Sequence, residues 1–228
     1  MAGLSLFAMA KRVTIFAGHY GSGKTNIAVN YALALKKEFE SVKIADLDIV
    51  NPYFRTKDSA KELEAAGIPL ISPAFANSNV ALPALPQELY SLVQRRDCYA
   101  VLDVGGDDRG AYALGRYTPY ILEENNYEMI FVANFYRPLT QTPEDALEVM
   151  REIELAGGIP FTAIVNNSNL GGLTTLADIE ATQAKAQALS RLAGLPILFT
   201  SARADLCPQE GSYFPLHLQE KYYDIKEN

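Results

Sequence analysis

The residues best suited to chemistry lie in one stretch near the N-terminus, GHYGSGKT, at positions 18–25. This stretch matches G-x-x-x-x-G-K-[ST], the phosphate-binding pattern called the P-loop. Glycines let successive backbone N–H groups converge on phosphate oxygens, and a following helix adds the positive end of its dipole. Lys24 is expected to reach the β- and γ-phosphates, and the Thr25 hydroxyl is expected to ligate magnesium. The stretch therefore predicts a nucleoside triphosphate site.

The predicted site includes the whole P-loop, the residue after it and two residues from other loops. The expected nucleotide-binding residues are Gly18, His19, Tyr20, Gly21, Ser22, Gly23, Lys24, Thr25, Asn26, Gly106 and Asn166. A glycine turn that merely joins a strand to a helix is the alternative. The context disfavours it, because an apolar run at 13–17 precedes the motif and a helical pattern at 26–39 follows it.

Two carboxylates at the ends of apolar runs are suited to act with the P-loop. Asp48 follows the run 42–47, and we expect it to orient water and ligate magnesium; a loop carboxylate or helix cap is the alternative. Asp103 lies in the run 99–104, before a glycine turn, and is expected to hold the magnesium hydration shell, while the Gly106 N–H senses the γ-phosphate. The predicted catalytic residues are Lys24 and Asp48, and the predicted metal ligands are Thr25, Asp48 and Asp103.

Base preference is argued from an asparagine-rich stretch, NNSN, at positions 166–169. Asn166 occupies the first position of the guanine-reading pattern N-K-x-D, but the position of the aspartate is Asn169. A carboxylate accepts two donors from guanine, whereas a carboxamide places a donor beside its single oxygen. The sequence therefore favours adenine over guanine. The alternative is that the stretch supplies loop geometry only.

Hydrophobic periodicity predicts strands that alternate with helices. The expected strands are 13–17, 42–47, 68–72, 99–104, 128–134, 161–165 and 197–200, and the expected helices are 26–39, 59–66, 87–95, 143–156 and 174–192. This alternation predicts a three-layer α/β fold, with a mostly parallel sheet of about seven strands and helices on both faces. The loops carrying Gly18, Asp48, Asp103, Asn166 and Ser201 would then open on one edge, which is the predicted active site. Asp107, Asp108 and Arg109 are expected in a solvated loop.

Composition limits the domain organisation and the partners. The chain has 228 residues with 49% hydrophobic composition, enough for one core, so we expect a single domain at 12–228 after an N-terminal extension at 1–11. That extension is too short to span a bilayer, and we expect a soluble protein. The net charge of −7 makes nonspecific DNA binding and an anionic membrane surface unlikely partners.

The cysteines and histidines are few and dispersed. Cys98 and Cys207 stand far apart, which suits a reducing cytoplasm, and we expect them to be structural thiols. His19 and His217 form no metal-ligand cluster in the sequence.

Four segments together resemble the MinD/ParA-like branch of P-loop ATPases, the CobQ/CobB/MinD/ParA nucleotide-binding group. They are GHYGSGKT, IADLDIVNPYFRT, AVLDVGGDDRGA and AIVNNSNLG, and the resemblance runs from Val13 to about Asp205. It implies that the P-loop lysine and threonine bind ATP and Mg²⁺, that Asp48 supports attack by water and that Asp103 supports the magnesium shell. It also implies a nucleotide-dependent homodimer that acts as a switch on a partner protein.

One position differs from that family. Its loop reads K-G-G-x-G-K-[ST], and the first lysine crosses the dimer interface to the other subunit's phosphates, whereas this chain has His19 there. Arg55, Arg109 and Arg137 are candidates to supply that charge, although each is more simply explained as a surface arginine.

The sequence therefore predicts a magnesium-dependent ATPase that switches a protein partner. Two alternatives stay open. One is an ATP-dependent ligase or phosphotransferase resembling dethiobiotin synthetase, which activates a small carboxylate. The other is a nonhydrolysing nucleotide sensor or assembly module. Turnover that requires a small substrate indicates the first, and tight ATP binding without turnover indicates the second.

Overall fold

A computed structural model describes residues 7, 10–47, 56–72, 87–106, 108–208 and 213–218, with the backbone alone at 57, 58, 108 and 109. Three residues named above, Asp48, Arg55 and Asp107, lie outside the described residues.

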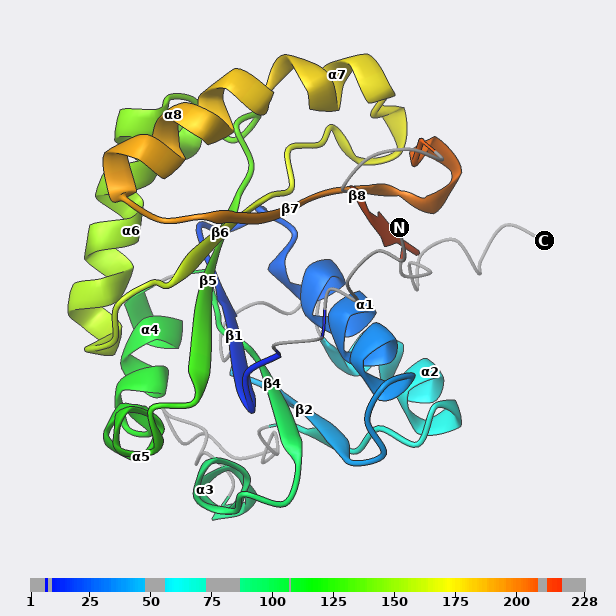
Figure 1. The fold of residues 1–228 in the computed structure, drawn as a ribbon, viewed down its shortest axis with the longest axis vertical. Helices are drawn as coiled ribbons and strands as arrows, with labels where there is room; N and C mark the ends of the chain where they lie inside the picture. The colour runs from blue at the N-terminus through cyan, green and yellow to red at the C-terminus, as the bar shows by residue number, and fades with distance from the viewer. Residues whose placement is uncertain are drawn as a thin grey trace, which may run out of the picture.

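Eight parallel strands form one sheet in the described part of the chain (Figure 1). They are β1 (Val13–Ala17), β2 (Val42–Asp46), β3 (Leu70–Ile71), β4 (Tyr99–Asp103), β5 (Tyr127–Ala133), β6 (Ala163–Asn166), β7 (Ile197–Arg203) and β8 (Tyr213–Leu216). Their order is β3-β2-β4-β1-β5-β6-β7-β8, and every pairing is parallel. The predicted α/β class with a parallel sheet is confirmed.

Helices cover both faces of the sheet, as Figure 1 shows. The helices are α1 (Lys24–Lys36), α2 (Ala60–Ala65), α3 (Gln87–Gln94), α4 (Asp108–Gly115), α5 (Thr118–Glu124), α6 (Pro143–Gly157), α7 (Leu176–Ala181) and α8 (Gln183–Ala193). Short 3-10 turns lie at η1 (Thr56–Ser59), η2 (Pro138–Thr140), η3 (Gly171–Leu173) and η4 (Ala204–Leu206). Helices α1 and α2 contribute to one buried apolar cluster, and α3, α4, α5, α6 and α8 contribute to the other. The sheet is therefore the middle of three layers.

Strand β1 is apolar on both sides because it is central. Ile15 belongs to the cluster under α3–α6, whereas the next residue, Phe16, belongs to the cluster under α1. Both side chains are fully buried. A continuous apolar run is what a parallel strand covered on both faces requires, so this packing explains why the P-loop follows such a run.

The structure adds one strand that sequence reasoning missed, β8 at the outer edge of the sheet. It contains Pro215, which an edge strand tolerates because one side of such a strand makes no ladder hydrogen bonds. Phe214 packs on Phe199 with ring centroids 4.7 Å apart. The Asn30 side chain of α1 exchanges two 2.9 Å hydrogen bonds with the backbone of His217, directly after β8. The edge strand is thereby attached to the helix that follows the P-loop.

Two helical regions also differ from the sequence prediction. Asp108 and Arg109 begin α4 instead of lying in a loop. Gly110 lowers the helix propensity there, but a Cβ on it would approach Gly105 Cα at 2.6 Å, so a small residue is required. The single helix expected at 174–192 is divided into α7 and α8 at Thr182, whose hydroxyl donates to the Ile179 carbonyl.

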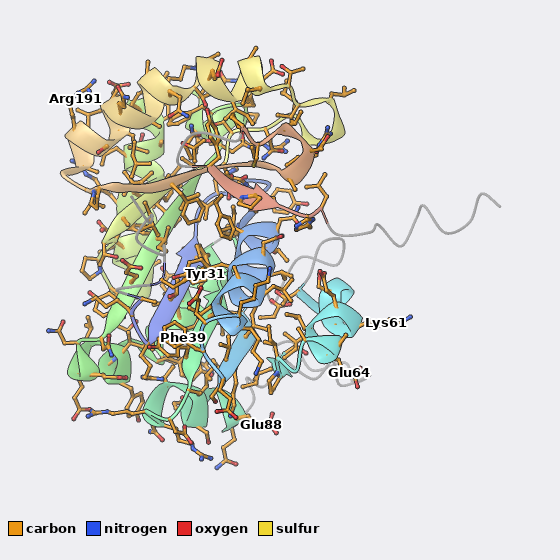
Figure 2. All side chains as sticks on the ribbon, turned by 45° about the vertical axis from the view of Figure 1, so that its right-hand side comes forward. Tyr31, Phe39, Lys61, Glu64, Glu88 and Arg191 are labelled. Atoms are coloured by element: carbon orange, nitrogen blue, oxygen red, sulfur yellow. The ribbon has the colours of Figure 1, made fainter. Side chains whose placement is uncertain are left out.

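The described part of the N-terminal stretch packs on the domain. Phe7 is buried, and its ring meets Tyr31 of α1 edge-on at 5.1 Å. Figure 2 shows Tyr31 where α1 faces the sheet, whereas Lys61, Glu64, Glu88 and Arg191 extend outward. Across the described ranges, no helix combines the length and apolarity needed to cross a membrane.

Candidate functional site

The P-loop joins the end of β1 to the start of α1 and closes around its lysine. Gly21 and Gly23 have φ values of 74° and 87°, in the left-handed region that favours glycine. The Lys24 side chain is 7% exposed, and its Nζ donates to the His19 carbonyl at 3.2 Å. The Ser22 N–H donates to the same carbonyl at 3.1 Å. A cation and a turn of backbone are therefore held together at one strand end.

Asp103 lies beside the P-loop because β4 is the neighbour of β1. Its Cα is paired in register with Phe16 on one side and with Asp46 on the other. Asp103 is 1% exposed, and its carboxylate accepts a 3.0 Å hydrogen bond from the hydroxyl of the buried Thr56. Thr56 is a site residue that sequence reasoning missed. The sequence signal that could have identified Thr56 is its position at the end of the segment IADLDIVNPYFRT, which carries the family resemblance.

Gly106 brings the turn after β4 into direct contact with the P-loop. A Cβ on Gly106 would lie 2.7 Å from both N and Cα of Tyr20 and 2.8 Å from the Lys24 Nζ. Real Cβ contacts essentially never come closer than 3.0 Å. Only glycine therefore allows this approach, and contact of the Gly106 N–H with a γ-phosphate stays a prediction.

Asn167, the neighbour of the predicted nucleotide-binding residue Asn166, links the loop after β6 to the P-loop. Its Nδ2 donates to the Ser22 carbonyl at 2.7 Å, and its Oδ1 accepts from the Ser201 hydroxyl at 2.6 Å. The side chain is 3% exposed, and a Cβ on Gly23 would lie only 2.3 Å from its Nδ2. One buried amide therefore connects the loop after β6, the P-loop and β7. No local pattern distinguishes Asn166 from Asn167, because the two adjacent residues carry the same side chain.

The other two asparagines of this stretch shape the loop. Asn166 is fully buried; its Nδ2 donates to Thr182 Oγ1 at 3.0 Å and its Oδ1 accepts from the Ser168 hydroxyl at 2.7 Å. Asn169 donates to the Asn167 carbonyl at 2.8 Å and accepts from the Gly171 N–H at 3.1 Å. A direct contact of Asn166 with a base stays a prediction.

A further residue reaches the P-loop from the turn after β5. Arg137 donates from its Nε to the Gly21 carbonyl at 2.8 Å. At the mouth of the loop, the Tyr20 side chain is 54% exposed, and the His19 Nδ1 lies 3.0 Å from the Tyr20 carbonyl oxygen. Of the three arginines considered from the sequence, Arg137 is the one whose side chain the structure describes, and it contacts the P-loop.

The residues present fit a magnesium polyphosphate. The P-loop supplies a cation and glycine-rich backbone, as a phosphate group requires. Thr25 and Asp103 carry the hard oxygen atoms that magnesium prefers, and magnesium in such sites is held by one or two carboxylates with substrate phosphates and waters. Nowhere in the described ranges do three His, Cys, Asp or Glu side chains form a metal-binding group of their own.

The two cysteines are not among the residues of the candidate site. Both are free, Cys98 is buried just before β4 and Cys207 is half-buried after η4. Burial raises the pKa of both thiols, which keeps them protonated and poorly nucleophilic.

Comparison with known proteins relates the chain to others through its fold. No protein-family model matches the sequence, and a search of curated proteins finds no match either. Among solved structures, the cell division protein FtsY from Thermotoga maritima has a TM-score of 0.59 and 19% identity, covering 84% of this chain and 61% of that one. FtsY from Mycoplasma mycoides has a TM-score of 0.51 and 16% identity, covering 84% of this chain and 60% of that one. This chain spans about three fifths of the length of each. At such identities the likeness shows a shared α/β fold and no more.

Proposed function

We propose that this protein binds ATP with magnesium and hydrolyses it, and that turnover resets a conformational switch acting on a protein partner. One observation carries the proposal. The buried Lys24 of the P-loop and the turn after Asp103 meet at the carboxyl edge of adjacent strands, with Gly106 packed against the P-loop backbone. Ligands of open α/β sheets bind at this edge.

The chain's own residues divide the work of binding and chemistry. Lys24 and the P-loop N–H groups stabilise charge on the transferring phosphoryl group. Thr25 and Asp103 hold the metal side, and Asp48 orients the attacking water. Magnesium, when bound, neutralises phosphate charge. Thr56 holds the Asp103 carboxylate, so a shift of Thr56 itself would move the carboxylate proposed to hold the metal shell.

Adenine is the proposed base. Reading guanine takes an acceptor pair, which an aspartate supplies, and Asn169 occupies that position in the sequence pattern. Its amide is also engaged within its own loop, with Asn167 and Gly171 as partners. Both facts support ATP over GTP.

The setting and partners follow from the resemblance to MinD/ParA-like ATPases. It supports a nucleotide-dependent homodimer that engages a second, unidentified protein in the cytoplasm. The segments that carry this resemblance include GHYGSGKT and AVLDVGGDDRGA, which hold the P-loop and Asp103.

The test is magnesium-dependent hydrolysis of ATP and GTP by the wild type and by Lys24→Ala and Asp48→Asn, with molecular mass measured alongside by light scattering. Lys61→Ala is a matched control, because this exposed lysine extends outward from α2 (Figure 2). We expect ATP turnover that both site variants lose and the control keeps. ATP-induced doubling of the mass supports the homodimer.

Three other outcomes contradict the proposal in different ways. Turnover that appears only with a small carboxylate identifies a ligase or phosphotransferase. Binding without turnover, alone or with a partner, identifies a sensor or assembly module. Equal or faster turnover of GTP contradicts the argument for adenine.

A further inference from the structure

Arg137 is seated against the middle of the P-loop although it comes from another part of the chain. Its Nε donates to the Gly21 carbonyl at 2.8 Å. A Cβ on Gly21 would lie 3.4 Å from the Nε and 3.7 Å from the Cζ of Arg137, so the guanidinium lies close beside this residue. Gly21 itself is exposed, and the guanidinium therefore borders the open side of the loop.

The turn that carries Arg137 is fixed by a fully buried asparagine. Asn134 accepts from the Tyr136 N–H at 3.1 Å through its side chain, and its carbonyl accepts from the Thr140 hydroxyl at 2.6 Å. The Arg137 N–H donates to the same carbonyl at 3.1 Å, and Pro138 then begins η2 with its φ already restricted. The position of Arg137 is thus set by the fold and not by a freely moving surface chain.

The charge of Arg137 is not used elsewhere in the described part of the chain. Three arginines there form ion pairs, namely Arg12 with Glu124, Arg95 with Asp97 and Arg203 with Asp205. Arg137 is in none of these pairs. Within the P-loop sequence itself, Lys24 is the single permanent cation.

We propose that Arg137 supplies a second positive charge to the polyphosphate site in cis, holding the P-loop through the Gly21 carbonyl while its Nη groups attract the β- and γ-phosphates. This inference rests on the proposed nucleotide binding and adds a phosphate-binding residue to that site. A planar guanidinium suits this role, because Nε can bond the loop while the two Nη groups remain available to phosphate oxygens.

An electrostatic role of Arg137 toward the phosphates and a purely structural role in the P-loop make different predictions. Attraction grows with the charge of the ligand, so loss of Arg137 must weaken ATP most, ADP less and AMP least. If Arg137 only shapes the P-loop, its loss lowers the affinity for every ligand of that loop by a similar factor. The ratio of ATP to ADP affinity therefore separates the two roles.

The experiment is calorimetric titration of the full-length chain with ATP, ADP and AMP in magnesium, for the wild type, Arg137→Gln and Arg137→Lys. Arg191→Gln is the matched control, since it removes the same charge from the exposed end of α8, as Figure 2 shows. Thermal unfolding of each variant reports on folding.

We expect Arg137→Gln to bind ATP on the order of tenfold more weakly, ADP about threefold more weakly and AMP unchanged. Arg137→Lys should keep the wild-type ratio of ATP to ADP affinity. If Arg137→Gln fails to fold, a second neutral variant, Arg137→Met, takes its place and should lower that ratio in the same way. Equal losses for all three ligands, or no loss, overturn the inference while leaving nucleotide binding intact. A wild type that binds none of the three overturns the proposed function as well.

Discussion

Replacing Gly106 by alanine tests the contact on which the site depends. The added Cβ would lie 2.7 Å from N and Cα of Tyr20 and 2.8 Å from the Lys24 Nζ. The lysine can move, but the two Tyr20 atoms belong to the backbone of the P-loop. The methyl group can therefore be accommodated only if the P-loop or the turn after β4 shifts.

The expected cost follows from overpacking at a tight contact. Inserting one methyl group into a well-packed position costs about 1–3 kcal/mol. If the shifted P-loop holds the strain, Mg-ATP affinity falls by roughly 5- to 150-fold, because each 1.4 kcal/mol is a factor of ten. The nucleotide-free protein then loses little stability, since the surface loop relaxes away from the methyl group.

Gly172→Ala is the matched control for this change. No atom lies within 4 Å of a Cβ at Gly172, in η3, and its φ is open to other residues. Both variants are titrated with Mg-ATP and unfolded thermally beside the wild type. We expect a loss of affinity in Gly106→Ala and none in Gly172→Ala. Wild-type affinity together with wild-type melting in Gly106→Ala would refute the packing argument.

Three further predictions concern other contacts. Glu124→Gln breaks the buried ion pair with Arg12 and should lower the free energy of unfolding, measured in urea, by about 3–5 kcal/mol. The double variant Glu124→Gln/Arg12→Met should lose less free energy than the sum of the losses in the two single variants. A loss equal to that sum would contradict an interaction between the two side chains. Burial raises the pKa of Tyr31 from 10.0 to about 12, so the unfolded chain releases this proton first and stability falls by up to about 2.7 kcal/mol as pH rises from 10.0 to about 12. Tyr31→Phe should reduce that alkaline slope in urea titrations across this pH range, and an unchanged slope argues against it. Asn167→Asp, which removes the donor to the Ser22 carbonyl, should weaken Mg-ATP binding about 10- to 100-fold by calorimetry, whereas Ser201→Ala should have a smaller effect; equal effects would be a contrary result.

The fold class could be predicted because each central strand is a strongly apolar run, and glycine-containing turns mark where several of these strands end. Val13–Ala17 is buried along its whole length, which is why its strand was recognised without ambiguity. The edge strand β8 was missed, because four residues containing Pro215 give no such run and are fixed instead by Phe199 and Asn30. Long-range contacts of this kind leave no local pattern in the sequence.

The site was predictable where chemistry depends on consecutive residues and not where it depends on tertiary contacts. Lys24 and Gly106 follow from motifs that local sequence displays. Thr56 and Asn167 join the candidate site through hydrogen bonds to residues far along the chain, and the neighbouring Asn166 has the same side chain with different partners. Arg137 was one of three arginines that the sequence left open, and its hydrogen bond to Gly21 is also a long-range contact. Asp48, the predicted water-orienting residue, stays a prediction because it lies outside the described residues.

The most direct test of the account is calorimetric titration of the wild type with ATP and with GTP, each in magnesium and in EDTA, repeated on Lys24→Ala. The account predicts one ATP per chain, weaker binding of GTP, a loss of affinity in EDTA and no measurable binding by Lys24→Ala. A wild type that binds neither nucleotide, or a Lys24→Ala variant that binds ATP as tightly as the wild type, would contradict the assignment of this strand edge as a magnesium nucleotide site.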